Sequence, residues 1–127
     1  MPADVVHSFI SAIEHHELEH ALTHLTEDCR YDNVPLGKVD GRDGVRSTLR
    51  PFLEGFEEVQ WVVTYQVASG NLDDGVVMNE RLDRFRKGDR WLELPVAGLF
   101  LIRHGQIALW RDYFDKESFL AQMTSSR

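Results

Sequence analysis

Apolar residues near the start of the chain recur at the period of a helix. Two such stripes follow one another, with spacings of three and four residues that are typical of amphipathic helices. The first consists of Val6, Phe9, Ile10 and Ile13, and the second of Leu18, Ala21, Leu22 and Leu25. We expect two short antiparallel helices joined by a tight turn near His15 and His16, each with its apolar face toward a larger element.

Turn-forming residues separate these two helices from a third one. A short extended segment at residues 30–34 is followed by Gly37 and Gly41, and the third helix is expected at residues 44–53. Because proline removes a helical hydrogen bond, we expect Pro51 to kink or end this helix.

The second half of the chain has the pattern of strands. It is rich in Val, Leu, Phe and Trp, and short turn-forming sequences interrupt it. The predicted strands are residues 61–68, 76–86, 91–103 and 106–115, and the connections are 71–75, 87–89 and 104–105. Such connections predict an antiparallel meander that the three helices cover on one face. With a closing helix at residues 116–123, the pattern predicts an α+β fold whose curved sheet has a pocket on its concave side.

Length and composition narrow the class of protein. The chain of 127 residues is expected to form a single domain over residues 1–127, and 43% hydrophobic with 28% charged residues is typical of a water-soluble protein. Apolar runs are too short to span a membrane, and the N-terminus lacks the features of a secretory signal, so we expect a cytoplasmic protein. The net charge of -7 argues against nucleic acid and membranes as partners and favours a small neutral molecule.

Two charged residues are expected to face the interior of the sheet. Alternation along residues 77–85 places Arg81 and Asp83 on one face, and Glu80 and Arg84 on the other. The face with Arg81 and Asp83 is the better inner face, because its two charges are ready partners, whereas the other face would bury two unpaired charges.

Three more polar residues occur in positions that suggest a site. Asp112 shares a strand face with Trp110 and Phe114, which indicates a carboxylate in an apolar pocket. Tyr31 and Asn33 lie two residues apart on an extended segment and project to the same side. A phenol and an amide can both hydrogen-bond a water molecule.

The segments that carry these residues together resemble the limonene-1,2-epoxide hydrolase family. The segments are Tyr-Asp-Asn-Val-Pro-Leu at 31–36, Asn-Glu-Arg-Leu-Asp at 79–83 and Trp-Arg-Asp-Tyr-Phe-Asp at 110–115. They occur in the family's order, and the resemblance extends from about Phe9 to Phe119. It implies a cone-shaped nuclear transport factor 2-like fold of the SnoaL-like superfamily, an epoxide hydrolase activity, no metal or other cofactor, and a homodimer.

The resemblance also implies roles for five residues. In that family one aspartate activates water with the help of a tyrosine and an asparagine, a second aspartate protonates the epoxide oxygen, and an arginine bridges the two carboxylates. The matching residues are Asp112, Tyr31, Asn33, Asp83 and Arg81. One-step opening needs a proton delivered to the epoxide oxygen while water attacks carbon from the opposite side. Two carboxyl groups in opposite protonation states can provide both, so burial must keep the second aspartate protonated. The residues expected to contact an apolar epoxide are Phe85, Leu94, Val96, Phe114 and Phe119.

Other interpretations stay open at this point. An Arg-x-Asp pair on a strand is by itself typical of a salt bridge. His16, His20 and His24 have a spacing that can bind metal, but a solvated helix face explains them without one. A ketosteroid-isomerase-like proton-transfer enzyme and a non-catalytic ligand-binding module are alternatives that share the fold. The substrate also stays open, since an apolar wall suits a terpene, a lipid or a sterol epoxide.

Overall fold

The structure, a computed structural model, describes residues 1–124, in which the chain forms four helices and six strands. The helices are α1 (Pro2–Glu14), α2 (Leu18–Leu22), α3 (Gly41–Glu54) and α4 (Lys116–Thr124). The strands are β1 (Leu25–Val34), β2 (Gly37–Asp40), β3 (Glu58–Gly70), β4 (Gly75–Lys87), β5 (Arg90–Arg103) and β6 (Gln106–Tyr113). None of the helices in this described part of the chain is both long and apolar enough to cross a membrane.

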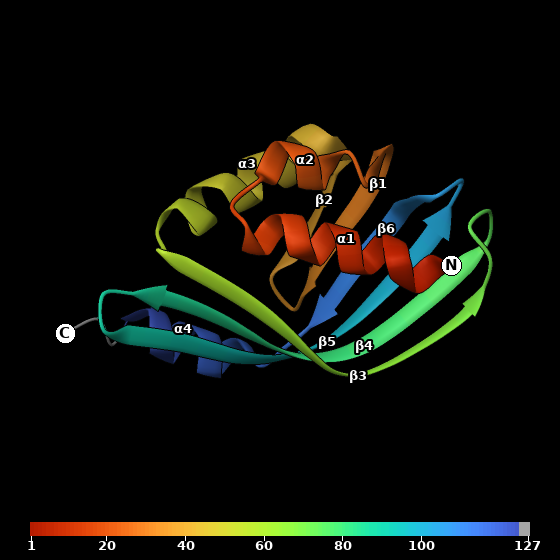
Figure 1. Ribbon diagram of the computed structural model, residues 1–127. Coiled ribbons are helices and arrows are strands. Elements are labelled where there is room, and N and C mark those ends of the chain that lie inside the picture. The colour runs from red at the N-terminus through yellow and green to blue at the C-terminus, as the bar shows by residue number, and fades with distance from the viewer. Residues whose placement is uncertain (125–127) are drawn as a thin grey trace.

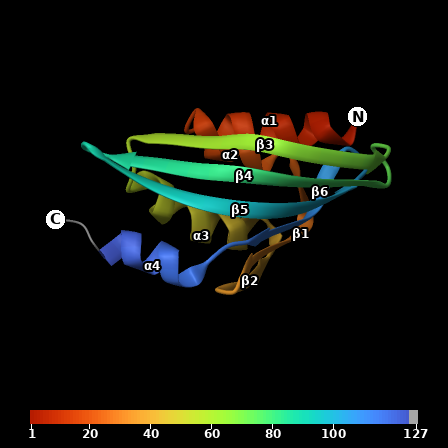
Figure 2. The ribbon, with the colours of Figure 1, turned by 90° about the horizontal axis from the view of Figure 1, so that it is seen from below.

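The six strands form one strongly curved sheet in the order β2-β1-β6-β5-β4-β3 (Figure 1). Strands β3 to β6 form the expected antiparallel meander. Strand β1 is parallel to its neighbour β6, and β2 is antiparallel to β1, so the sheet is mixed. Helices α1, α2 and α3 lie on the concave side, and α4 lies beside β5 (Figures 1 and 2). This arrangement confirms the predicted α+β fold.

The core lies between the concave face and the first three helices. The apolar stripe of α1 is buried, and so are Val45, Leu49 and Leu53 on the inner face of α3. Burial alternates along β4, where every second residue from Val77 to Phe85 faces inward. The prediction that this face is the inner one is therefore confirmed.

The second helix is shorter than the sequence pattern predicted. Helix α2 ends at Leu22, and Leu25 instead begins β1, where it pairs with Ile107. An apolar residue at helical spacing is equally suited to a buried strand, and Leu25 is part of the sheet here. His24 consequently lies outside the helix and is partly buried, so the prediction of a solvated helix face for the histidines is wrong at this residue.

The third helix continues through Pro51. It runs to Glu54, one turn beyond the residue that was expected to kink or end it. Proline at this position leaves the carbonyl of Ser47 without its helical donor, but Ser47 is exposed and its carbonyl can meet water. The extra turn places the buried Leu53 against the core.

Candidate active site

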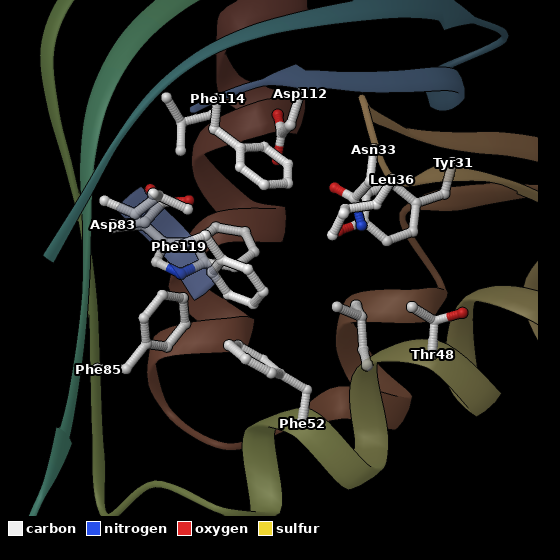
Figure 3. Close-up of a pocket in the computed structure, with 14 residues that line it drawn as sticks. Tyr31, Asn33, Leu36, Thr48, Phe52, Asp83, Phe85, Asp112, Phe114 and Phe119 are labelled. Atoms are coloured by element: carbon white, nitrogen blue, oxygen red, sulfur yellow. The ribbon is translucent and has the colours of Figure 1, made fainter. Parts of the chain in front are cut away.

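A cavity of about 180 Å³ opens between the concave face of the sheet and helix α3. Figure 3 shows Asp83 and Asp112 on its sheet side, and Phe52 and Thr48 on the side of α3. Its lining consists of Tyr31, Asn33, Leu36, Thr48, Leu49, Phe52, Trp61, Asp83, Phe85, Leu94, Val96, Asp112, Phe114 and Phe119. Most of these side chains are apolar, so a polar group that faces the cavity has little water to compete with.

A buried arginine joins two buried aspartates at the sheet side of this cavity. Arg81 Nε donates to Asp83 Oδ1 at 2.9 Å, and Arg81 Nη2 donates to Asp83 Oδ2 at 2.9 Å. The same Nη2 atom donates to Asp112 Oδ2 at 2.9 Å. The side chain of Arg81 is fully buried, and those of both aspartates are 6% exposed. Arg81 is therefore part of a three-residue cluster with Asp83 and Asp112, and not of an Arg-x-Asp salt bridge alone.

Strand pairing explains why the cluster forms. Arg81 and Asp83 lie on β4, whereas Asp112 lies on β6, and β5 separates these two strands. The β5 residue between the strands is Gly98, which pairs with Asp112 on one side and with Asn79 on the other. Because glycine has no side chain, the guanidinium of Arg81 can extend across β5 to reach Asp112.

The parallel pairing of β1 with β6 brings Tyr31 and Asn33 to the same region. Asn33 is the partner of Asp112 in the register, and Tyr31 is the partner of Trp110. The ring of Tyr31 stacks on that of Trp110 with the centroids 3.8 Å apart. Both Tyr31 and Asn33 line the cavity next to Asp112 (Figure 3). No residue in the described part of the chain hydrogen-bonds Asp112 Oδ1, although this atom is buried.

Burial and neighbouring charges shift the pKa values of Asp83, Arg81 and Tyr31. Burial raises the pKa of Asp83 to about 6, although the charge and hydrogen bonds of Arg81 act in the opposite direction. Burial also disfavours the charged form of Arg81, but Asp112 and Asp83 outweigh this effect and raise its pKa, so it stays cationic. Burial and the charge of Asp112 raise the pKa of Tyr31, which therefore stays a neutral phenol.

The five residues predicted to form the apolar wall all line the cavity. They are Phe85, Leu94, Val96, Phe114 and Phe119. Phe114 and Phe119 pack edge to face with centroids 5.8 Å apart, which places the start of α4 over the cavity. Of the predicted polar residues, Tyr31, Asn33, Asp83 and Asp112 also line it. Arg81 lies behind the two aspartates and does not line it.

Sequence reasoning missed several residues of the wall. Leu49 and Phe52 come from α3, and their spacing of three residues was a signal that they share a helix face. Trp61 lies two residues after the buried Val59 on β3 and pairs with Asp83. The two-residue period of a strand would therefore have placed it on the inner face. No cluster of His, Cys, Asp and Glu suitable for a metal ion occurs among residues 1–124.

Two buried carboxyl groups joined by a guanidinium, at the wall of an apolar cavity, form an arrangement that is suited to acid–base chemistry. Residues 1–125 match the family described as limonene-1,2-epoxide hydrolase catalytic domain. The chain therefore belongs to the limonene-1,2-epoxide hydrolase family, as its motifs predicted.

One protein sequence and two solved structures illustrate what this chain is similar to. The chain is 29% identical to epoxide hydrolase EphG of Mycobacterium tuberculosis over 112 residues, which is 87% of this chain and 70% of that protein. The structure of an M. tuberculosis LEH-like epoxide hydrolase matches with a TM-score of 0.80 and 25% identity, covering 98% of this chain and 90% of that one. An NTF2-like protein from Burkholderia pseudomallei matches with a TM-score of 0.77 and 22% identity, covering 97% of each chain, which confirms the nuclear transport factor 2-like fold.

Proposed function

We propose that this protein adds water to an apolar epoxide and forms a vicinal diol in one step, without a metal or organic cofactor. The observation that carries the proposal is the bridge of Arg81 between two buried carboxyl groups, of which Asp112 has a buried oxygen, Oδ1, with no hydrogen-bond partner among the described residues. Family membership and the similarity to an epoxide hydrolase support the same reaction class.

Asp112 acts as the base in this proposal. Its Oδ2 accepts a hydrogen bond from Arg81, and its Oδ1 is left to accept a proton. The phenol of Tyr31 and the amide of Asn33 hold a water molecule. This water gives a proton to Asp112 while the oxygen of the water attacks one epoxide carbon. The bond between that carbon and the epoxide oxygen breaks at the same time.

Asp83 acts as the acid and gives its proton to the departing oxygen. After one turnover Asp112 holds a proton and Asp83 is ionised, and one proton passing from the first to the second restores the starting state. Water and epoxide together contain all the atoms of the diol. A ketosteroid-isomerase-like reaction would need only one base and one donor, and would leave Asn33 and the bridge of Arg81 without a function.

A screen of the purified protein against a panel of terpene, lipid and sterol epoxides, with diol detection, tests the function. For a substrate found in this way, a single turnover with excess enzyme in heavy-oxygen water tests the mechanism. Direct attack by water puts the solvent label into the first diol formed and none into the aspartates. Unlabelled diol, with label later in Asp83 or Asp112, would show an ester intermediate and contradict the one-step reaction.

The proposed acid predicts a pH dependence. Because the pKa of Asp83 is raised to about 6, its protonated form is lost as the pH rises through that value. We therefore expect kcat/KM to fall by about tenfold for each pH unit above about 6, since this parameter reports the free enzyme. A pH profile with one epoxide measures it. A kcat/KM that stays constant up to about pH 8 would contradict the assignment of Asp83 as the acid.

We infer that a second copy of this chain covers the outer face of β3 and β4. This face carries contiguous exposed apolar side chains, among them Tyr65 at 76% and Val67 at 70% exposure, and Val67 is paired with the exposed Met78. An isologous dimer buries such a strip against the same strip of the second copy.

Sedimentation of the wild type should show a dimer, and Val67→Arg should make it a monomer. A wild-type monomer at micromolar concentration would contradict the inference.

A further inference from the structure

Asn79 is a buried polar residue of the cluster that does not line the cavity. It lies on the inner face of β4, two residues before Arg81, and is 5% exposed. Its Oδ1 accepts a hydrogen bond from Arg81 Nη1 at 3.1 Å, and its Nδ2 donates to Gln66 Oε1 at 3.3 Å. The contact with Arg81 orients the amide, because a guanidinium can only donate, so the oxygen must point toward it and the nitrogen points toward Gln66.

Gly98 leaves the space that the side chains of Asn79, Arg81 and Asp112 occupy. Asn79, Gly98 and Asp112 are neighbours in one row across β4, β5 and β6. A Cβ atom added at Gly98 would come within 2.5 Å of Arg81 Nη1, 2.9 Å of Asp112 Oδ1 and 3.0 Å of Asn79 Oδ1. The guanidinium therefore lies directly on the backbone of β5, with the amide on one side and a carboxylate on the other.

The four hydrogen bonds of the guanidinium divide between carboxyl and amide acceptors. Asp83 accepts from Nε and Nη2, Asp112 accepts from Nη2, and Nη1 has an amide acceptor, which is Asn79. One arginine, two aspartates and one shared proton have no net charge. A carboxylate in place of the amide would bring a third carboxyl group and an uncompensated negative charge to a buried group of side chains.

We propose that Asn79, seated beside Gly98, is a positioning residue that holds the guanidinium of Arg81 between the two aspartates and keeps their shared proton in balance. The proposal rests on the function proposed above for the aspartates. It goes further by assigning a task to a residue that does not line the cavity. The alternative is that Asn79 merely fills space in the core.

The groups that face the shared proton come from four elements. Besides Arg81 and Asp112, they are Glu14 on α1, whose charge raises the pKa of Asp83, and Tyr31 on β1, a neutral phenol. The β5 residues that face this region are Leu94, Val96 and Gly98, which carry no charge. A new carboxylate at position 79 therefore changes a balance that few other charges can compensate.

The test uses Asn79→Asp and Asn79→Leu, with Asn71→Asp as the matched control. Asn71 lies in the exposed turn between β3 and β4, where its Oδ1 accepts from two backbone N–H groups, and aspartate can do the same. The first measurement is the titration of the Asp83 carboxyl carbon by NMR in the free protein, which needs no substrate. The second is the pH profile of kcat/KM for the epoxide found in the screen.

Asn79→Asp should raise the apparent pKa of Asp83 by about one unit or more, because a like charge nearby favours protonation. The fall of kcat/KM above about pH 6 should then move to higher pH, and Asn71→Asp should not move it. Asn79→Leu should lower kcat by about tenfold with little change in KM, since Arg81 loses its orientation while the apolar wall is intact.

An unchanged Asp83 titration in Asn79→Asp would overturn the proposal, because position 79 would then have no electrostatic link to the shared proton. Asn79→Leu with a wild-type kcat would overturn it as well. If Asn79→Leu fails to fold, Asn79→Asp carries the test, since aspartate has nearly the same shape. A wild-type protein that opens no epoxide would contradict the proposed function, whereas the NMR titration would still decide the role of Asn79.

Discussion

Asp112→Asn is expected to lower kcat/KM for epoxide hydrolysis by about a thousandfold, which is the range for loss of a general base. The substitution keeps the shape of the side chain, but an amide cannot take a proton from water. Arg81 Nη2 needs an acceptor, so the amide oxygen should face Arg81 and the amide nitrogen should face the water. The water would then accept a hydrogen bond where it must donate one.

The fold should tolerate this change. Asp115→Asn is a matched control three residues further along, because Asp115 Oδ1 accepts from the backbone N–H of Glu117 and asparagine can do so too. Thermal unfolding should show both variants folded, with full activity only in Asp115→Asn. An Asp112→Asn enzyme that retains more than about a tenth of the wild-type kcat/KM would remove the base from the mechanism.

Local patterns were sufficient to predict one strand of the site. Alternation along β4 and the cost of burying unpaired charge together placed Arg81 and Asp83 on the inner face. Neither pattern says which residue of another strand lies beside them. Asp112 reaches Arg81 because β5 intervenes with a glycine, and Asn33 lies beside Asp112 because β1 pairs in parallel with β6. Both facts depend on register between distant segments, and only the family's motifs pointed to them.

The residues that were missed owe their positions to packing between elements. Phe52 lines the cavity because α3 continues through Pro51, and Leu25 leaves its predicted helix because it pairs in the sheet. Asn79 lies on the inner face that alternation along β4 predicts, but its task depends on an Arg81 side chain whose other acceptors lie on two strands. Gly98 has no side chain to give a periodic signal, and its importance lies in what surrounds it.

Arg81→Leu is expected to destabilise the protein by about 3–5 kcal/mol at neutral pH, in addition to abolishing most of its activity, because it leaves two buried carboxyl groups without their cation. Unfolding in urea at several pH values measures this effect. The control is Arg30→Leu, which breaks an exposed ion pair with Asp40 and should change stability far less.

The pH dependence of this loss identifies its cause. Without Arg81, the pKa of each buried aspartate should lie above its value in the unfolded chain, so the folded state binds protons more tightly. A carboxyl group shifted in this direction loses its stabilising contribution as the pH rises from the unfolded pKa through the folded one. Arg81→Leu should therefore be much closer to wild-type stability near pH 4 than near pH 7.

Adding Asp83→Asn to Arg81→Leu should restore part of the stability at neutral pH, since one of the two uncompensated charges is removed. A deficit that is equal at all pH values, and that the second substitution does not reduce, would show that Arg81 stabilises the fold by packing alone.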